Sequence, residues 1–286
     1  LKCIKSFRYA LKKESGKVLI IRNQNFHACR HHSSEEERDK CDRCDKETRE
    51  SPNRVQKRIN KEEDDDIEKL KSIFKKLGFT DIKGGTEPFV QKDKSKKEMI
   101  KLLEQVAQAD FSDDYCFICV ILSCGKDGVI FCKDDSQDGN SSTRYPTPSM
   151  MLPVSELQEC LKGDKCQGLL MKPKIFLLQL EPVQTNTTDP MTQGSKEEPT
   201  TPLKIPREAD FLIYNCETAF VPHTGIKAWI QGLNEHVVGK KEPLEIQRLL
   251  TRMNNIVRSY YEKKEGISVE LPCVTSLLTK EVYLGK

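Results

Sequence analysis

The stretch KPKIFLLQLEPV, residues 172–183, predicts a buried strand that carries a short loop into a functional site. Its central residues, Ile175 to Leu178, are all apolar, which is typical of a strand covered on both faces in a parallel sheet. In such sheets, ligands gather at the carboxyl ends of the strands. Gln179 and Glu181, which follow the apolar run, are therefore candidate site residues.

Two further apolar runs predict neighbouring strands, namely KVLIIRN at 17–23 and YCFICVILS at 115–123. Between them, residues 67–77 carry apolar side chains at helical spacing. Strands that alternate with helices predict an α/β fold. We expect one globular unit with a mainly parallel central sheet of about six strands and helices on both faces.

The composition narrows the classes of function. With 47 basic and 44 acidic residues among 286, the net charge of +3 predicts no broad basic surface for nucleic acid. Twelve cysteines, together with the absence of a signal peptide and of a long apolar segment, indicate reduced thiols in the cytoplasm and no membrane partner.

Two segments lack the pattern of a folded core. Residues 33–66 contain only two aliphatic side chains, too little apolar area to offset the entropy of ordering, and predict a mobile, disordered insertion. Residues 184–206 are rich in Thr, Pro and Gln and read as a linker. This linker separates residues 1–183 from residues 207–286.

One short segment contains candidate zinc ligands, namely Cys29, His31, Cys41 and Cys44. Cys41 and Cys44 have the C-x-x-C spacing of a zinc knuckle, but a structural zinc site needs four ligands that converge. The segment has no second knuckle, so the simpler interpretation is a hydrophilic loop that contains cysteines. We therefore expect no metal and no cofactor, and keep a zinc-binding interaction scaffold as an alternative.

Four motifs resemble those of the caspase family (peptidase C14-like), and they follow in that family's order. K-P-K, four apolar residues and Gln, at 172–179, are similar to the strand that presents the caspase nucleophile. Residues 115–125, 208–212 and 272–283 resemble the strand before the catalytic histidine, the entry to the small subunit and the closing strands. The resemblance implies a caspase-like fold, with large-subunit-like and small-subunit-like segments on either side of the linker.

The resemblance also implies that the catalytic pair is lost. Glu181 stands where caspases have their cysteine, and Cys124 stands where they have the histidine of Ser-His-Gly. A glutamate cannot supply a thiolate, and a cysteine without a neighbouring imidazole lacks the group that would activate it. Gly125 and the backbone N–H at Glu181 retain the outline of an oxyanion hole. The chain is therefore expected to be a pseudoprotease.

Substrate capture is expected to be weak as well. Caspases bind the substrate aspartate with two arginines and a glutamine, an arrangement suited to a carboxylate. Gln179 matches the glutamine, as a vestige. Arg58 lies near the expected place of the first arginine, but its spacing does not fit and the role is not assigned to it. Residues 219–226 contain no arginine for the second position, and His223 is the nearest basic residue.

By analogy with inactive caspase-like regulators, we expect the chain to tune death signalling by pairing with an active caspase or its adaptor, or with itself. In caspases the closing strand forms the dimer centre, which makes Val274, Leu277, Leu278 and Val282 candidate interface residues. A strand covered by the chain's own loops is the alternative. A cysteine endopeptidase with aspartate specificity and substituted catalytic residues is the competing function.

Overall fold

A computed structural model of the chain describes residues 7–9, 15–23, 52–86, 88–135, 147–181, 209–217, 223–262 and 271–285. The linker, the candidate zinc ligands and the first part of the segment at 33–66 lie outside the described residues. Among the described helices, none is long and apolar enough to cross a bilayer.

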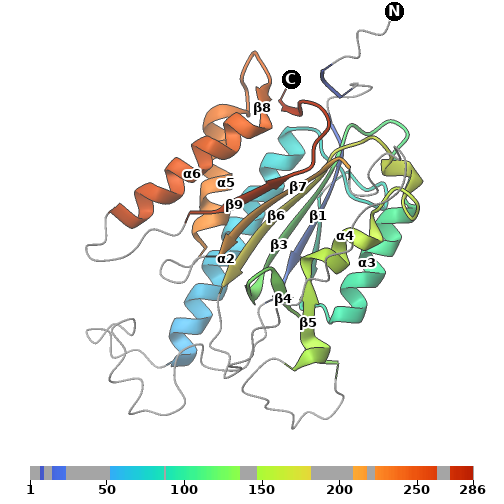
Figure 1. Cartoon of the computed structure of the whole chain (residues 1–286). Coiled ribbons are helices and arrows are strands. Elements are labelled where there is room, and N and C mark those ends of the chain that lie inside the picture. Colours follow the sequence, from blue (N-terminus) through green and yellow to red (C-terminus); the bar gives the residue numbers. More distant parts are fainter. Residues whose placement is uncertain are drawn as a thin grey trace, which may run out of the picture.

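The central sheet has the strand order β2-β1-β3-β6-β7-β9 (Figure 1). Neighbouring strands are parallel except β7 and β9, which pair antiparallel at one edge. The strands are β1 (Lys17–Arg22), β2 (Phe89–Lys92), β3 (Phe117–Lys126), β6 (Lys174–Glu181), β7 (Phe211–Glu217) and β9 (Cys273–Ser276). The predicted α/β fold with a mainly parallel sheet is confirmed.

Short strands extend this framework at two places. At the carboxyl end of β3, the chain folds back through β4 (Val129–Phe131), which also pairs with β5 (Met151–Pro153). Elsewhere, β8 (Leu244–Glu245) and β10 (Tyr283–Leu284) form a separate antiparallel pair. Two 3-10 turns, Pro148–Met150 and Gln167–Leu169, flank α4.

Helices cover both faces of the sheet (Figure 1). One face carries α2 (Pro52–Lys76), α5 (Thr224–His236) and α6 (Ile246–Glu262), whose apolar side chains join one core cluster. The other face carries α3 (Lys96–Gln108) and α4 (Val154–Cys160), which pack around a second cluster.

Strands β3 and β6 are buried on both faces, as their apolar runs predict. In β3, Ile118 and Val120 belong to one core cluster, whereas Cys119 and Ile121 belong to the other. Each fully buried aliphatic side chain contributes roughly 1.5–3 kcal/mol relative to its exposed state. The two central strands therefore fix the position of whatever follows their carboxyl ends.

Helix α2 corrects the prediction of a mobile segment at 33–66, because the helix begins at Pro52 and includes residues 52–66. Proline is favoured at the first helical position, and the Gln, Lys, Arg and Glu residues that follow are good helix formers. Glu63 and Asp64, on this part of α2, both pair with Arg22 of β1. The prediction considered only aliphatic side chains. It therefore missed a helix whose first half is attached to β1 by ion pairs with Arg22.

A buried polar junction ties the amino-terminal end of the described chain to its closing segment. The Tyr9 hydroxyl donates a hydrogen bond of 2.5 Å to the Asp210 carboxylate, and the Thr279 hydroxyl donates another of 2.5 Å to the same oxygen. The backbone N–H of Thr279 in turn donates to the Tyr9 hydroxyl at 3.1 Å. These bonds hold residues 7–9 against the residue that precedes β7.

The closing segment forms a shorter sheet strand than predicted, because β9 ends at Ser276. Val282 is 0% exposed, so its side chain lies in the core of its own chain and offers no surface to a partner. The predicted interface is therefore wrong at this residue. Leu277 is 42% exposed, whereas Val274 and Leu278 pack partly against the core.

Candidate functional site

The candidate site lies at the carboxyl ends of β3 and β6. Cys124 and Glu181 are register partners across these two parallel strands, so the chain brings together the two residues at the predicted catalytic positions. Cys124 is buried with 1% exposure. On the adjacent strand, Glu181 places a carboxylate where the family has its catalytic cysteine.

Gly125 lies where β3 folds back into β4. A Cβ atom at this position would lie 2.4 Å from the backbone oxygen of Val129, so only glycine fits. Beyond it, the turn is closed by Glu217 of β7, whose carboxylate accepts hydrogen bonds of 3.1 Å from the backbone N–H groups of Asp127 and Gly128. A carboxylate from β7 therefore binds two backbone donors of the hairpin that follows Cys124. The oxyanion role suggested for Gly125 stays a prediction.

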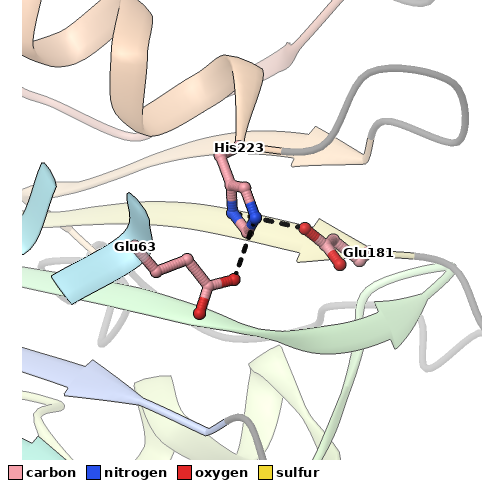
Figure 2. Close-up of side chains that lie close together, drawn as sticks. All are labelled: Glu63, Glu181 and His223. Atoms are coloured by element: carbon pink, nitrogen blue, oxygen red, sulfur yellow. Dashed lines mark ion pairs between the residues drawn. The ribbon is translucent and has the colours of Figure 1, made fainter. Parts of the chain in front are cut away.

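Three titratable side chains, Glu63, Glu181 and His223, lie close together at this end of the sheet (Figure 2). The imidazole of His223 lies with Nε2 3.0 Å from Glu63 Oε1 and with Nδ1 3.4 Å from Glu181 Oε1. Glu63 comes from α2, Glu181 from the end of β6, and His223 from the residue before α5. His223 has a left-handed backbone, with φ of 59°. The cluster is thus assembled from three elements that are distant in the sequence.

Arg22, the last residue of β1, completes the cluster. Its side chain is 2% exposed, and its Nε and Nη2 donate hydrogen bonds of 3.1 and 3.0 Å to Glu63 Oε2. Its Nη1 donates to Asp64, which also accepts a hydrogen bond of 2.8 Å from Lys92. Partial burial raises the pKa of Asp64, but the Lys92 hydrogen bond and the Arg22 charge outweigh it and lower the pKa overall. Glu63 and Asp64 therefore both pair with the guanidinium of Arg22, and Asp64 pairs with Lys92 as well.

Gln179, the candidate substrate-binding amide, is 1% exposed. Its Oε1 accepts a hydrogen bond of 2.6 Å from the backbone N–H of Gly225. A Cβ at Gly225 would lie 2.3 Å from that oxygen, so the first turn of α5 approaches the amide closely because it has glycine there. The amide is thereby fixed at the wall of the site.

The space that remains between these side chains is very small. A cavity of about 10 Å³ is enclosed by the following residues: Arg22, Asn23, Glu63, Leu122, Ser123, Gln179, Glu181 and His223. Such a volume holds about one water molecule. A side chain from another molecule therefore has no room at this position in the described conformation.

The sequence analysis missed two residues of this site, Arg22 and Glu63. Arg22 gave a signal, since it is a charged residue at the end of an otherwise apolar strand. Glu63 gave none, because it lies within a run of acidic residues. The side chain of Arg58 lies outside the described residues, and His223, the nearest basic candidate in the sequence, does line the cavity.

Glu63, Glu181 and His223 are also the described residues whose geometry would suit a metal ion, since their donor atoms lie within 4.8 Å of one another. However, the guanidinium of Arg22 already neutralises Glu63 at 3.0 Å. A divalent cation at this place would have to compete with that guanidinium for the Glu63 carboxylate. The arrangement therefore fits an ion-pair network better than a metal centre, and the predicted zinc ligands lie outside the described residues.

Most described cysteines are buried, and burial suppresses their nucleophilic form. Burial raises the pKa of Cys132 and of Cys216 to about 12, and it raises the pKa of Cys116 and Cys119 as well. Since the thiolate is the nucleophile, these side chains are inert at neutral pH. Among the described cysteines, Cys273 on β9 is the exposed one.

Comparisons with known proteins point to one family. The sequence profile described as "Caspase domain" matches residues 56–283. Caspase-7 of Gallus gallus is 30% identical over 299 residues, which cover 97% of this chain and 80% of that protein. Caspase-3 of Bos taurus is 29% identical over 284 residues, which cover 94% of this chain and 84% of that protein. The solved structure named "structure of pro-sf-caspase-1" shares the fold with a TM-score of 0.60 at 22% identity, over 98% of both chains.

Proposed function

This chain belongs to the caspase family, and from that premise we propose that it is a catalytically inactive member that acts by binding. Its partner is an active caspase or a death-signalling adaptor, or a second copy of the chain, and its effect is to regulate apoptosis or related death signalling in the cytoplasm. In this proposal the chain has the family's fold without the family's chemistry.

The observation that carries the proposal is the pair formed by Cys124 and Glu181. These residues lie side by side at the ends of β3 and β6, where the family resemblance predicts the histidine and the cysteine. A carboxylate at the nucleophile position cannot form a thioester with a peptide carbonyl. Cys124 is 1% exposed, so its sulfur is not presented to a substrate either.

The closed pocket supports the same conclusion. A protease of this family must admit an aspartate side chain, but the cavity beside Gln179 measures about 10 Å³ and is lined by two of the chain's own carboxylates, Glu63 and Glu181. Loss of the nucleophile and loss of the substrate pocket are two independent obstacles to catalysis. Restoring one of them leaves the other in place.

The binding role is supported by the edge of the sheet. β9 pairs on one side with β7 and is the last strand of the sheet, so its other side is an edge in the described part of the chain. Such edges pair readily with a strand from another molecule. Leu271 and Leu277, which flank β9, are 51% and 42% exposed and supply apolar surface beside it.

One observation favours the competing function, a cysteine endopeptidase with substituted residues. The His223 imidazole lies 3.4 Å from Glu181, so the site retains an acid–base pair near Cys124. This hypothesis requires Cys124 to be the nucleophile and predicts that its thiol forms a covalent adduct with a substrate-like probe.

The two functions are separated by one labelling experiment. The purified chain is incubated with an aspartyl fluoromethylketone, and intact mass is measured with an active caspase as the positive control. We expect no adduct on the chain, whereas a stoichiometric adduct that is lost in Cys124→Ala would establish the protease. The same preparation, passed over immobilised purified caspases one at a time, tests the binding role. Metal analysis of it tests the zinc scaffold.

A further inference from the structure

Both ring nitrogens of His223 lie close to carboxylate oxygens (Figure 2). Nε2 is 3.0 Å from Glu63 Oε1, and Nδ1 is 3.4 Å from Glu181 Oε1. A neutral imidazole has a proton on one nitrogen and a lone pair on the other, whereas an imidazolium has a proton on both. A lone pair this close to a carboxylate oxygen would be repelled. Both contacts are therefore attractive when the ring has two protons, and imidazole is more basic than a carboxylate.

The charges around the imidazole point to the same protonation state. Ion pairs connect it, directly or through one another, to two cations and three carboxylates in the described part of the chain: Arg22, Lys92, Glu63, Asp64 and Glu181. With a neutral ring these groups have one negative charge in excess, and with an imidazolium they balance. An uncompensated charge is costly in a buried site, and His223 is only 4% exposed. Cys124, the register partner of Glu181, is a thiol and adds no positive charge.

A proton at this place joins parts of the fold that are distant in the sequence. Glu181 is the last residue of β6, Glu63 lies on α2, and His223 is the residue before α5. The backbone of His223 is left-handed, with φ of 59°, a conformation that a residue other than glycine keeps only when its surroundings hold it. The two ion pairs of its side chain are contacts of this kind. Without the proton, the end of β6 would lose an attachment to α5.

We propose that Glu63, Glu181 and His223 form a buried proton-binding site, which acts as a pH-sensitive clasp between the end of β6, α2 and the start of α5. With the proton bound, the three elements are fastened as described, and release of the proton loosens them. The ligand is the proton itself, so neither a substrate nor a metal takes part. The inference does not rest on the proposed function, because it holds for a protease and for a regulator alike.

The direction of the pH effect follows from the two states of the chain. In the unfolded chain, a histidine releases its proton near about pH 6.5. In the folded chain, two adjacent carboxylates favour the charged ring and outweigh the cost of burial, so release requires a higher pH. The clasp is therefore complete below about pH 6 and is lost as the pH rises through the point at which the folded cluster releases its proton. We expect at least about tenfold tighter proton binding in the folded chain, which places this point above about pH 7.5.

Nuclear magnetic resonance of the ring nitrogens reports this proton directly. The chain is labelled with nitrogen-15 histidine, and the ring signals of its five histidines are followed from about pH 5.5 to about pH 9 with EDTA present. His223→Gln identifies the signal of His223 by its absence. We expect both ring nitrogens of His223 to show the shifts of an imidazolium at about pH 7.5, where the histidines of the urea-unfolded chain are neutral.

Glu181→Gln tests whether the carboxylate at the end of β6 helps to hold the proton. The amide has nearly the same shape without the charge, so His223 should release its proton at lower pH, with a several-fold lower affinity. The matched control is Glu235→Gln, because Glu235 faces His236 at 3.9 Å on the more exposed part of α5. This control should leave the titration of His223 unchanged.

Hydrogen exchange tests whether the proton acts as a clasp. The backbone N–H of Gly225 donates to Gln179 Oε1, so its exchange rate reports how firmly the start of α5 is attached to β6. After correction for the intrinsic pH dependence of exchange, this rate should rise as His223 releases its proton. The amides of β3, an inner strand, serve as the control and should not follow the titration.

Each outcome decides for or against the proposal. A neutral ring of His223 at about pH 7.5, or a titration that Glu181→Gln leaves unchanged, would overturn it. Exchange at Gly225 that does not follow the proton would overturn the clasp. If His223→Gln does not fold, substituting the other four histidines one at a time identifies the remaining signal. Tight binding of added zinc at neutral pH without EDTA, with loss of the imidazolium signal, would assign the cluster to a metal instead.

Discussion

Cys124 and Glu181 lie opposite each other in the register of β3 and β6, at the carboxyl edge of a parallel sheet. That edge is where α/β proteins place their chemistry. In this chain, it holds a buried thiol on one strand and, on the next, a carboxylate that pairs with His223. The structure thus brings together the two residues that the family resemblance places at the catalytic positions.

Restoring the two catalytic groups should not restore the enzyme. We expect the variant with Glu181→Cys and Cys124→His to cleave aspartyl peptides at least about 100-fold more slowly than an active caspase assayed beside it. The reason is that Glu63 still lines the small cavity next to Gln179 in this variant, which leaves no room for the substrate aspartate. Steady-state rates with a fluorogenic aspartyl peptide check this, with circular dichroism as the control for folding. Rapid cleavage would show that the pocket admits substrate.

Arg22 should be among the most costly residues to replace. Arg22→Met leaves Glu63 in a buried site without its guanidinium, and breaking a buried pair in this way costs about 3–5 kcal/mol of unfolding free energy. The control is Arg258→Met, since Arg258 and Glu262 form an exposed pair on α6 that is worth about 0.5 kcal/mol or less. Urea denaturation of both variants measures the difference. Similar losses in the two would contradict the role given to Arg22.

Leu277, one of the two exposed leucines that flank β9, should control association. Leu277→Asp places a charge on apolar surface that is 42% exposed, so it should weaken pairing with a partner strand without unfolding the chain. Leu278→Asp is a poorer test, because Leu278 packs partly against the core. Light scattering and capture by immobilised caspases report the effect, with Leu170→Asp, at a 51% exposed residue away from β9, as the control. Unchanged association in the folded Leu277→Asp variant would remove the interface assignment.

Alkaline pH should destabilise the chain through Tyr9. Burial, followed by the hydrogen bond to Asp210, raises the pKa of Tyr9 from 10.0 to about 12. Because the folded state resists ionisation and the unfolded state does not, this contribution is complete below pH 10 and is lost as the pH rises to about 12. Its upper limit is about 2–3 kcal/mol. Urea titrations between pH 8 and pH 12 should show a smaller alkaline loss for Tyr9→Phe than for the natural chain; equal losses would argue against this assignment.

Local sequence patterns predicted the centre of the fold because its strands are apolar throughout. The runs at 17–23, 115–123 and 172–183 all become central strands, and the resemblance placed Cys124 and Glu181 at positions that the structure brings together. Both the runs and the motifs are contiguous in the sequence. Contiguous signals of this kind are readable without knowledge of distant contacts.

The charged part of the site could not be predicted in this way. Arg22 and Glu63 are both buried and form an ion pair with each other, although each is a residue type that usually lies on the surface. Burial of either becomes favourable only when the other is in place, and they lie 41 positions apart. Val282 could not be placed for a different reason. An apolar residue can be buried against a partner or in the core of its own chain, and the sequence pattern does not distinguish the two. In the structure, β9 ends at Ser276, and Val282 lies beyond it, buried in the core.

The pairing of β6 with β7 has a consequence for the integrity of the molecule. These strands flank the linker, and they are joined in parallel register from Lys174 with Phe211 to Leu180 with Glu217. The boundary between residues 1–183 and residues 207–286 therefore lies between two inner strands of the sheet. A nick in the linker would break one covalent bond, but pulling the fragments apart would strip two buried strands of their backbone partners. Cleavage of the linker would therefore not separate the two segments, and the cleaved chain would stay together as a non-covalent complex of two fragments.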